Sequence, residues 1–187
     1  MISDKLLNEI DRGRQGLNHG ISMKLPKLES IIDGVTRETY TLILSNSGAG
    51  KTSFALYAYV YRPLMEHLDD DDFKVLYFSL EMGEVALYIK LLSIYIFETY
   101  GIQLSFKKIL SREKEYILSD EHYDLVKQCM PWIDKISKKL EIYDKKVTPK
   151  KVYAILKTRL EEMGTFSESE TRLVYTPNNP NLIYNVV

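Results

Sequence analysis

The sequence contains few of the residues that disulfide bridges and metal centres require. Cys129 is its only cysteine, so an intrachain disulfide bond is impossible and a reducing cytoplasm is the simplest location. Its three histidines, His19, His67 and His122, are scattered without the spacing of metal ligands. We therefore expect neither a disulfide framework nor a structural metal.

Long apolar runs and a surplus of one charge are also missing. The longest strongly apolar stretch, Ala86–Phe97, is interrupted by Lys90 and is too short to span a bilayer. Acidic residues near the N-terminus, such as Asp4 and Glu9, do not fit a signal peptide. The formal net charge of −1 does not indicate a dedicated nucleic-acid-binding domain. The composition excludes a membrane protein and wholesale disorder, and it favours a globular cytoplasmic chain.

A length of 187 residues, 45% of them hydrophobic, suits one domain with a substantial core. Residues 2–11 place their apolar side chains on one helical face, and glycines follow as a short linker. This helix either packs on its own domain or docks on a neighbouring subunit. We therefore divide the chain into an N-terminal helix with linker, residues 1–19, and a nucleotide-binding domain, residues 20–187.

Apolar, β-rich runs alternate with helical patterns in that domain, which predicts an α/β fold with a mainly parallel sheet flanked by helices. The predicted strands are Tyr40–Leu44, Val75–Leu80, Leu140–Tyr143, Arg172–Thr176 and Leu182–Val187. Helices are predicted from Ser53 to near Arg62-Pro63, over Glu84–Phe97, throughout 104–140, and from Pro149 to Gly164, with a polar loop over 165–171.

The segment between the first predicted strand and helix resembles a phosphate-binding loop. The usual pattern is G-x-x-x-x-G-K-[ST], and its last four positions match here, while Ser45 replaces the first glycine. Backbone N–H groups of such a loop and the following helix N-terminus bind phosphate. We expect ATP to contact Ser45, Asn46, Ser47, Gly48, Ala49, Gly50, Lys51, Thr52 and Ser53.

Two side chains of this loop have specific predicted roles. Lys51 would reach the β- and γ-phosphates of ATP and act in catalysis, and the Thr52 hydroxyl would bind the nucleotide's Mg²⁺. The alternative is a Gly/Ser-rich turn that precedes Lys-Thr by chance. A strand before the loop and a helix after it favour the phosphate site.

Glu81 follows the second predicted strand. The carboxyl ends of strands line the ligand crevice of a doubly wound sheet, and ATP hydrolysis needs a group that orients or deprotonates water. A carboxylate in this position can equally serve only as a charge near a helix N-terminus. The position by itself leaves both roles open.

The segment Val75-Leu-Tyr-Phe-Ser-Leu-Glu-Met82, taken with the loop, resembles the DnaB-type replicative DNA helicases, a RecA-like P-loop ATPase family. The likeness runs over about residues 20–164. It implies that Glu81 activates water, that ATP and Mg²⁺ are cofactors, and that the complete protein forms a hexameric ring on single-stranded DNA. It also implies that residues 2–11 pack on an adjacent protomer, and a phage origin would mean the cytoplasm of a bacterial host.

Two departures from that family matter. Ser45 replaces a glycine. The sequence also ends at Val187, before the position at which the family has its Mg²⁺-associated aspartate, DNA-binding loops and arginine finger. We therefore expect a fold that is incomplete at its C-terminus and a fragment that is a poor ATPase on its own. Two alternatives stay open: another RecA-type ATPase such as a recombinase, and a non-hydrolysing P-loop module that acts as scaffold or regulator of a helicase.

Overall fold

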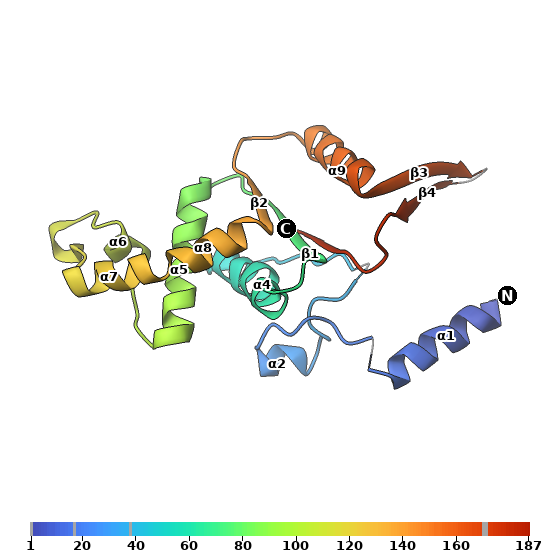
Figure 1. Cartoon of the computed structure of the whole chain (residues 1–187), viewed down its shortest axis with the longest axis horizontal. Helices are drawn as coiled ribbons and strands as arrows, with labels where there is room; N and C mark the ends of the chain where they lie inside the picture. Colours follow the sequence, from blue (N-terminus) through green and yellow to red (C-terminus); the bar gives the residue numbers. More distant parts are fainter. Residues whose placement is uncertain (1, 17, 38, 170–171) are drawn as a thin grey trace.

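Helices surround a small sheet in the protein, whose structure is a computed structural model (Figure 1). It describes residues 2–16, 18–37, 39–169 and 172–187. The α-helices are α1 (Ile2–Arg14), α2 (Pro26–Glu29), α3 (Lys51–Ala55), α4 (Arg62–Glu66), α5 (Glu84–Tyr100), α6 (Phe106–Ile109), α7 (Asp120–Gln128), α8 (Met130–Ser137) and α9 (Pro149–Met163). A π-helix, η1 (Leu56–Tyr61), and a 3₁₀ turn, η2 (Lys114–Tyr116), complete the helical segments.

The main sheet has three parallel strands in the order β2-β1-β5: β2 (Leu140–Tyr143), β1 (Phe73–Phe78) and β5 (Ile183–Val186). Val75 of β1 lies opposite Leu140 on one side and Asn185 on the other. The predicted α/β class with a mainly parallel sheet is therefore confirmed. A separate antiparallel hairpin, β3 (Gly164–Ser169) with β4 (Arg172–Pro177), extends from the end of α9 (Figure 1).

One face of the sheet carries the main core. Side chains alternate along a strand, and Phe73, Val75 and Tyr77 of β1 point toward η1, α4, α5 and α8. This side is called the core face below. Trp132 of α8 stacks on Tyr95 of α5 with ring centroids 4.1 Å apart, which joins these two helices on the core face. Each large apolar side chain buried here stabilises the fold by about 1.5–3 kcal/mol.

The helix after the predicted phosphate loop does not stop near Arg62-Pro63, as expected, but continues through α4 to Glu66. Proline lacks an N–H and normally ends or bends a helix. The helix instead widens into η1 just before Pro63, and Arg62 N–H donates to the Tyr57 carbonyl, five residues back. The π-turn thus accommodates the proline within a longer helical run.

The predicted strand Tyr40–Leu44 does not form, which corrects the sequence prediction. Its backbone makes no hydrogen bond to another described residue, and Tyr40, Leu42 and Leu44 are 87%, 64% and 80% exposed. Contacts on either side of the segment involve residues that flank β5. The Arg37 guanidinium donates to the Asn181 carbonyl at 3.2 Å, and Ile43 packs in the same cluster as Val187.

Two further predictions need correction. Residues 104–140 are not wholly helical, because α6, η2, α7 and α8 are separated by turns, and the hydroxyls of Ser105 and Ser119 cap new helices. Residues 165–169 of the predicted loop form β3, whereas residues 170 and 171 lie outside the described part of the chain. Pro131 lies in the first turn of α8, and the Thr148 hydroxyl caps α9 by accepting the Lys151 N–H.

The N-terminal helix α1 stands apart from the rest of the molecule (Figure 1). None of its residues is buried, and its exposed apolar side chains belong to Ile2, Leu6, Leu7 and Ile10. The alternative in which this helix packs on its own domain is therefore wrong. Among the described residues, no helix combines the length and apolarity needed to cross a bilayer.

Candidate functional site

The predicted phosphate loop connects the extended segment 39–45 to α3. Gly48 and Gly50 have positive φ values of 80° and 89°, a left-handed conformation that a residue with a Cβ adopts at a cost. Apart from the chain neighbours, no atom lies within 4 Å of the position a Cβ would take at either glycine, so neither glycine packs against another part of the protein. Gly50 is the N-cap of α3, whose helical backbone starts at Lys51.

Lys51 folds back across this loop. Its Nζ donates to the carbonyl oxygens of Ser45 and Asn46, at 3.0 Å each. The Ala49 N–H donates to the Asn46 carbonyl at 3.3 Å, which closes the turn. The ammonium group therefore lies over the start of the loop, where its acceptors among the described residues are two neutral carbonyls, and an anion would be a stronger acceptor because of its charge.

The residues that follow Lys51 lie in the first turn of α3. The first N–H groups of a helix have no intrahelical acceptor, and together with the helix dipole they favour an anion. The Thr52 hydroxyl has no hydrogen-bond partner among the described residues. The Ser53 hydroxyl accepts from Lys90 Nζ of α5 at 3.4 Å, which brings a second cation near the loop.

Glu81 lies just beyond the carboxyl end of β1, in a turn closed by Ser79. The Ser79 hydroxyl donates to the Met82 carbonyl at 2.6 Å and accepts the Met82 N–H at 3.1 Å. This turn holds Glu81 at its exposed tip. Burial raises the pKa of the Tyr77 hydroxyl, and the charge of nearby Glu81 raises it further.

The predicted site residues are only partly brought together. Residues 45–53 form one continuous loop and helix start, as the sequence predicts. No hydrogen bond or ion pair joins Glu81 to any of them in the described structure. The connection between the two parts runs through α5, which follows Glu81 in sequence and carries Lys90.

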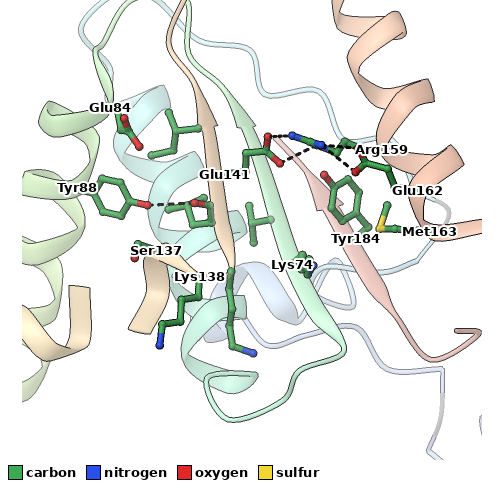
Figure 2. A pocket seen from close by; sticks show the side chains of 14 residues that line it. Lys74, Glu84, Tyr88, Ser137, Lys138, Glu141, Arg159, Glu162, Met163 and Tyr184 are labelled. Carbon is green, nitrogen blue, oxygen red and sulfur yellow. Dashed lines mark hydrogen bonds and ion pairs between the residues drawn. The ribbon is translucent and has the colours of Figure 1, made fainter. Parts of the chain in front are cut away.

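A pocket of about 630 Å³ lies elsewhere, along β2 and α9 (Figure 2). Arg159 of α9 spans it, with hydrogen bonds to Glu141 of β2 at 2.5 Å and to Glu162 at 2.9 Å. The two carboxylates raise the pKa of the guanidinium. None of the predicted site residues lines this pocket, and its central cation is already paired, so we interpret the Arg159 cluster as a brace between α9 and the sheet.

The chain's own residues suit a nucleotide-bound metal better than a protein-held one. Among the described residues, no cluster of three or more His, Cys, Asp or Glu side chains could hold an ion. Thr52 supplies a hydroxyl oxygen beside the loop, and Mg²⁺ keeps waters and phosphate oxygens as its other ligands when it binds with ATP. Residues 45–53 therefore fit the predicted Mg·ATP without a dedicated metal site.

A contact that the sequence analysis missed joins β5 to the helix behind the loop. Asn185 Nδ2 donates to the Tyr59 carbonyl of η1 at 2.6 Å. In an α-helix that carbonyl would accept from residue 63, but Pro63 has no N–H. A buried carbonyl without a donor costs about 1–3 kcal/mol, and Asn185 supplies a donor where Pro63 has none. Pro63 was the sequence feature that could have indicated this contact, because it lacks the N–H for the Tyr59 carbonyl, but it was interpreted as a helix end.

Comparison with known proteins does not assign the chain to a family. No protein-family model matches the chain, and no curated protein sequence matches it. The resemblance described above therefore rests on the motifs alone.

Proposed function

We propose that the chain binds ATP with Mg²⁺ through Ser45–Thr52 and serves as the ATP-binding part of a DnaB-type helicase motor with a RecA-like fold. The observation that carries the proposal is the geometry of the loop. Two glycines in left-handed conformation have free space beside them, a helix starts at Lys51, and the Lys51 ammonium lies across the loop. These are features of a phosphate cradle, whereas the strand that precedes such a loop in the usual pattern does not form here.

Phosphate binding follows from the charges around this loop. ATP would draw Lys51 Nζ from two neutral carbonyls to the β- and γ-phosphates, which are stronger acceptors because they are charged. Lys90, 3.4 Å from the Ser53 hydroxyl, adds positive charge on the α5 side. Thr52 would complete the Mg²⁺ shell. ATP without Mg²⁺ should therefore bind more weakly than Mg·ATP.

Hydrolysis in this proposal depends on Glu81. A water-activating carboxylate must lie within hydrogen-bond reach of the attacking water near the γ-phosphate. Glu81 lies exposed at the carboxyl end of β1, where a parallel sheet binds its ligands. Because no contact fixes Glu81 against the loop, catalysis requires the turn at Ser79–Met82 to close on the nucleotide.

The helicase part of the proposal adds two partners. The exposed apolar face of α1 suits an arm that packs on an adjacent protomer, because an amphipathic helix left uncovered exposes Ile2, Leu6, Leu7 and Ile10 to water. Together with the Ser-Leu-Glu-Met segment, this supports a homo-oligomeric ring acting on single-stranded DNA in the complete protein.

Two observations favour a second candidate, a non-hydrolysing nucleotide-binding scaffold. Ser45 stands where the loop pattern has glycine, and Glu81 does not contact the loop. In that case the chain would bind Mg·ATP and keep it intact. ATP turnover separates the candidates, because both require the same loop for binding.

Calorimetric titration with Mg·ATP tests the binding. The Lys51→Ala variant should lose at least about tenfold in affinity, because the loop then lacks its main cation. Glu81→Gln should leave affinity within about twofold and lower ATP turnover at least about tenfold. Lys24→Ala, at an exposed lysine remote in sequence from the loop, is the control for simple loss of positive charge.

The outcomes distinguish the two candidates. Affinity unchanged in Lys51→Ala would remove the loop from the account of nucleotide binding. Affinity lost in Lys51→Ala with no turnover in the wild-type chain or in a ring assembled with its partners would select the scaffold. Full turnover in Glu81→Gln would assign this glutamate a structural role.

A further inference from the structure

We infer that Asn185 is a positioning residue for the phosphate loop, and that it couples β5 to this loop through the backbone of Tyr59. The inference deepens the proposed function and rests on it for the nucleotide readout. Asn185 touches neither the loop nor any predicted ligand. Its effect reaches the loop through successive contacts, from Tyr59 to Phe54 and from Phe54 to Gly50.

The first contact exists because of a proline. Pro63 leaves the Tyr59 carbonyl without its α-helical donor, and the helix adopts a π-turn over Leu56–Tyr61. Asn185 Nδ2 donates to that carbonyl at 2.6 Å, across 126 residues of sequence. Asn185 is partly buried on the core face of β5, where Ile183 two residues earlier also packs. The side chain therefore reaches the helix from a fixed strand.

The next contacts lead from Tyr59 to the loop. The ring of Tyr59, nearly buried, meets the ring of Phe54 edge-on, with centroids 6.1 Å apart and planes at 73°. The Phe54 N–H donates to the Gly50 carbonyl at 2.9 Å, the first hydrogen bond of α3. Gly50 is the loop residue at φ 89° directly before Lys51. Phe54 thus joins the anchored part of the helix to the loop.

The same cluster holds the chain on both sides of this path. Ile43, two residues before the loop, and Val187, two residues after Asn185, both pack against the cluster formed by Met23, Ala58 and Tyr59. The loop is otherwise exposed from Leu44 to Gly50. Since no backbone hydrogen bond joins residues 40–44 to another described residue, the position of the loop depends on α3 and on this cluster. Fixing Tyr59 therefore fixes the end of the loop that carries Lys51.

Asn185→Leu tests the coupling, because leucine has a similar size and cannot donate. We expect the exchange rate of the Phe54 amide hydrogen, measured by NMR without nucleotide, to rise about fivefold, and Mg·ATP affinity to fall about three- to fivefold. Asn181→Leu is the matched control, since that exposed asparagine uses only backbone atoms in its hydrogen bonds to Arg37 and Asn179.

Rescue separates positioning from a general loss of packing. Pro63→Ala supplies an N–H four residues after Tyr59, so adding it to Asn185→Leu should return both the exchange rate and the affinity to within about twofold of wild type. Phe54 exchange and affinity equal to those of Asn181→Leu would overturn the inference, as would a loss in Asn185→Leu that the added Pro63→Ala leaves unchanged.

The two readouts keep this inference distinct from the proposed function. If the wild-type chain binds no Mg·ATP, the proposed function fails, and the exchange rate of Phe54 still decides whether Asn185 positions the loop. If the wild-type chain binds Mg·ATP and Phe54 exchange is unchanged by Asn185→Leu, the coupling is wrong and the function stands.

Discussion

Two extended apolar segments of this chain have similar β-rich compositions but adopt different structures. Phe73–Phe78 becomes the central strand β1, paired on both sides, with its core-face side chains buried. Tyr40-Thr-Leu-Ile-Leu44 has the same β-rich composition, yet it stays unpaired, and only Ile43 packs against the body of the protein. Strand propensity largely measures how well a residue fits a pleated surface already present. The comparison shows that neighbours decide the outcome.

The difference has an energetic side. A central strand satisfies its backbone groups in two ladders and buries side chains on its core face and, at Leu76, on the opposite face, whereas a lone extended segment leaves its backbone groups to water. Leu76 and Leu42 give a matched pair, because one is fully buried in β1 and the other is 64% exposed. Substitutions of the same kind at both positions measure how much the paired environment contributes.

The largest effect is expected for Leu76→Ala. This side chain is 0% exposed, so its truncation removes buried apolar area and leaves a cavity beside β1. The expected loss is about 2–5 kcal/mol of unfolding free energy, measured by urea denaturation followed by circular dichroism. A loss below about 1 kcal/mol would contradict the assignment of β1 as the stabilising centre of the sheet.

This contrast also explains how much of the fold could be predicted. The runs that became β1, β2 and β5 were located to within two residues, with β1 at Phe73–Phe78 instead of Val75–Leu80, because apolar composition indicates burial and these segments pair with neighbouring strands. The strand predicted at Tyr40–Leu44 was wrong because local composition carries no information on whether a neighbouring strand is available for pairing. The hairpin strand β3 was missed because its Ser- and Glu-containing sequence has the composition of a loop, and pairing with β4 overrides that preference.

The candidate site was predictable where it is local in sequence. Residues 45–53 were identified from spacing, since glycines, Lys51 and Thr52 lie in one short stretch. Asn185 could not be found in this way, because its partner Tyr59 is 126 residues distant. Pro63 was the available local signal, and it was interpreted as a helix end because the donor that replaces its missing N–H comes from another element.

A smaller effect is expected from pH at β5, the strand that carries Tyr184. Burial, with a smaller contribution from the charge of Glu141, raises the pKa of Tyr184 from 10 to about 12. The folded state therefore holds this proton more tightly than the unfolded state does. That stabilisation is complete below pH 10 and is lost as the pH rises from 10 to 12.

Tyr184→Phe should remove this part of the pH dependence. Urea unfolding midpoints at several pH values between 8 and 11 should fall less steeply in the variant than in the wild-type chain. Parallel curves would show that Tyr184 is hydrated in solution and that the β5 side of the sheet is less closed than its pairing with β1 implies.

The smallest effect is expected for Leu42→Ala, the exposed counterpart of Leu76→Ala. Truncating a side chain that is 64% exposed in an unpaired segment should change the unfolding free energy by less than about 0.5 kcal/mol. The same urea titration measures it. A loss comparable to that of Leu76→Ala would mean that Leu42 is buried in solution, by an added strand beside β5 or by another copy of the chain. Repeating the titration at tenfold higher protein concentration separates these causes, because only burial by another copy strengthens with concentration. In either case residues 40–44 would be paired or covered in solution, and the contrast with β1 would disappear.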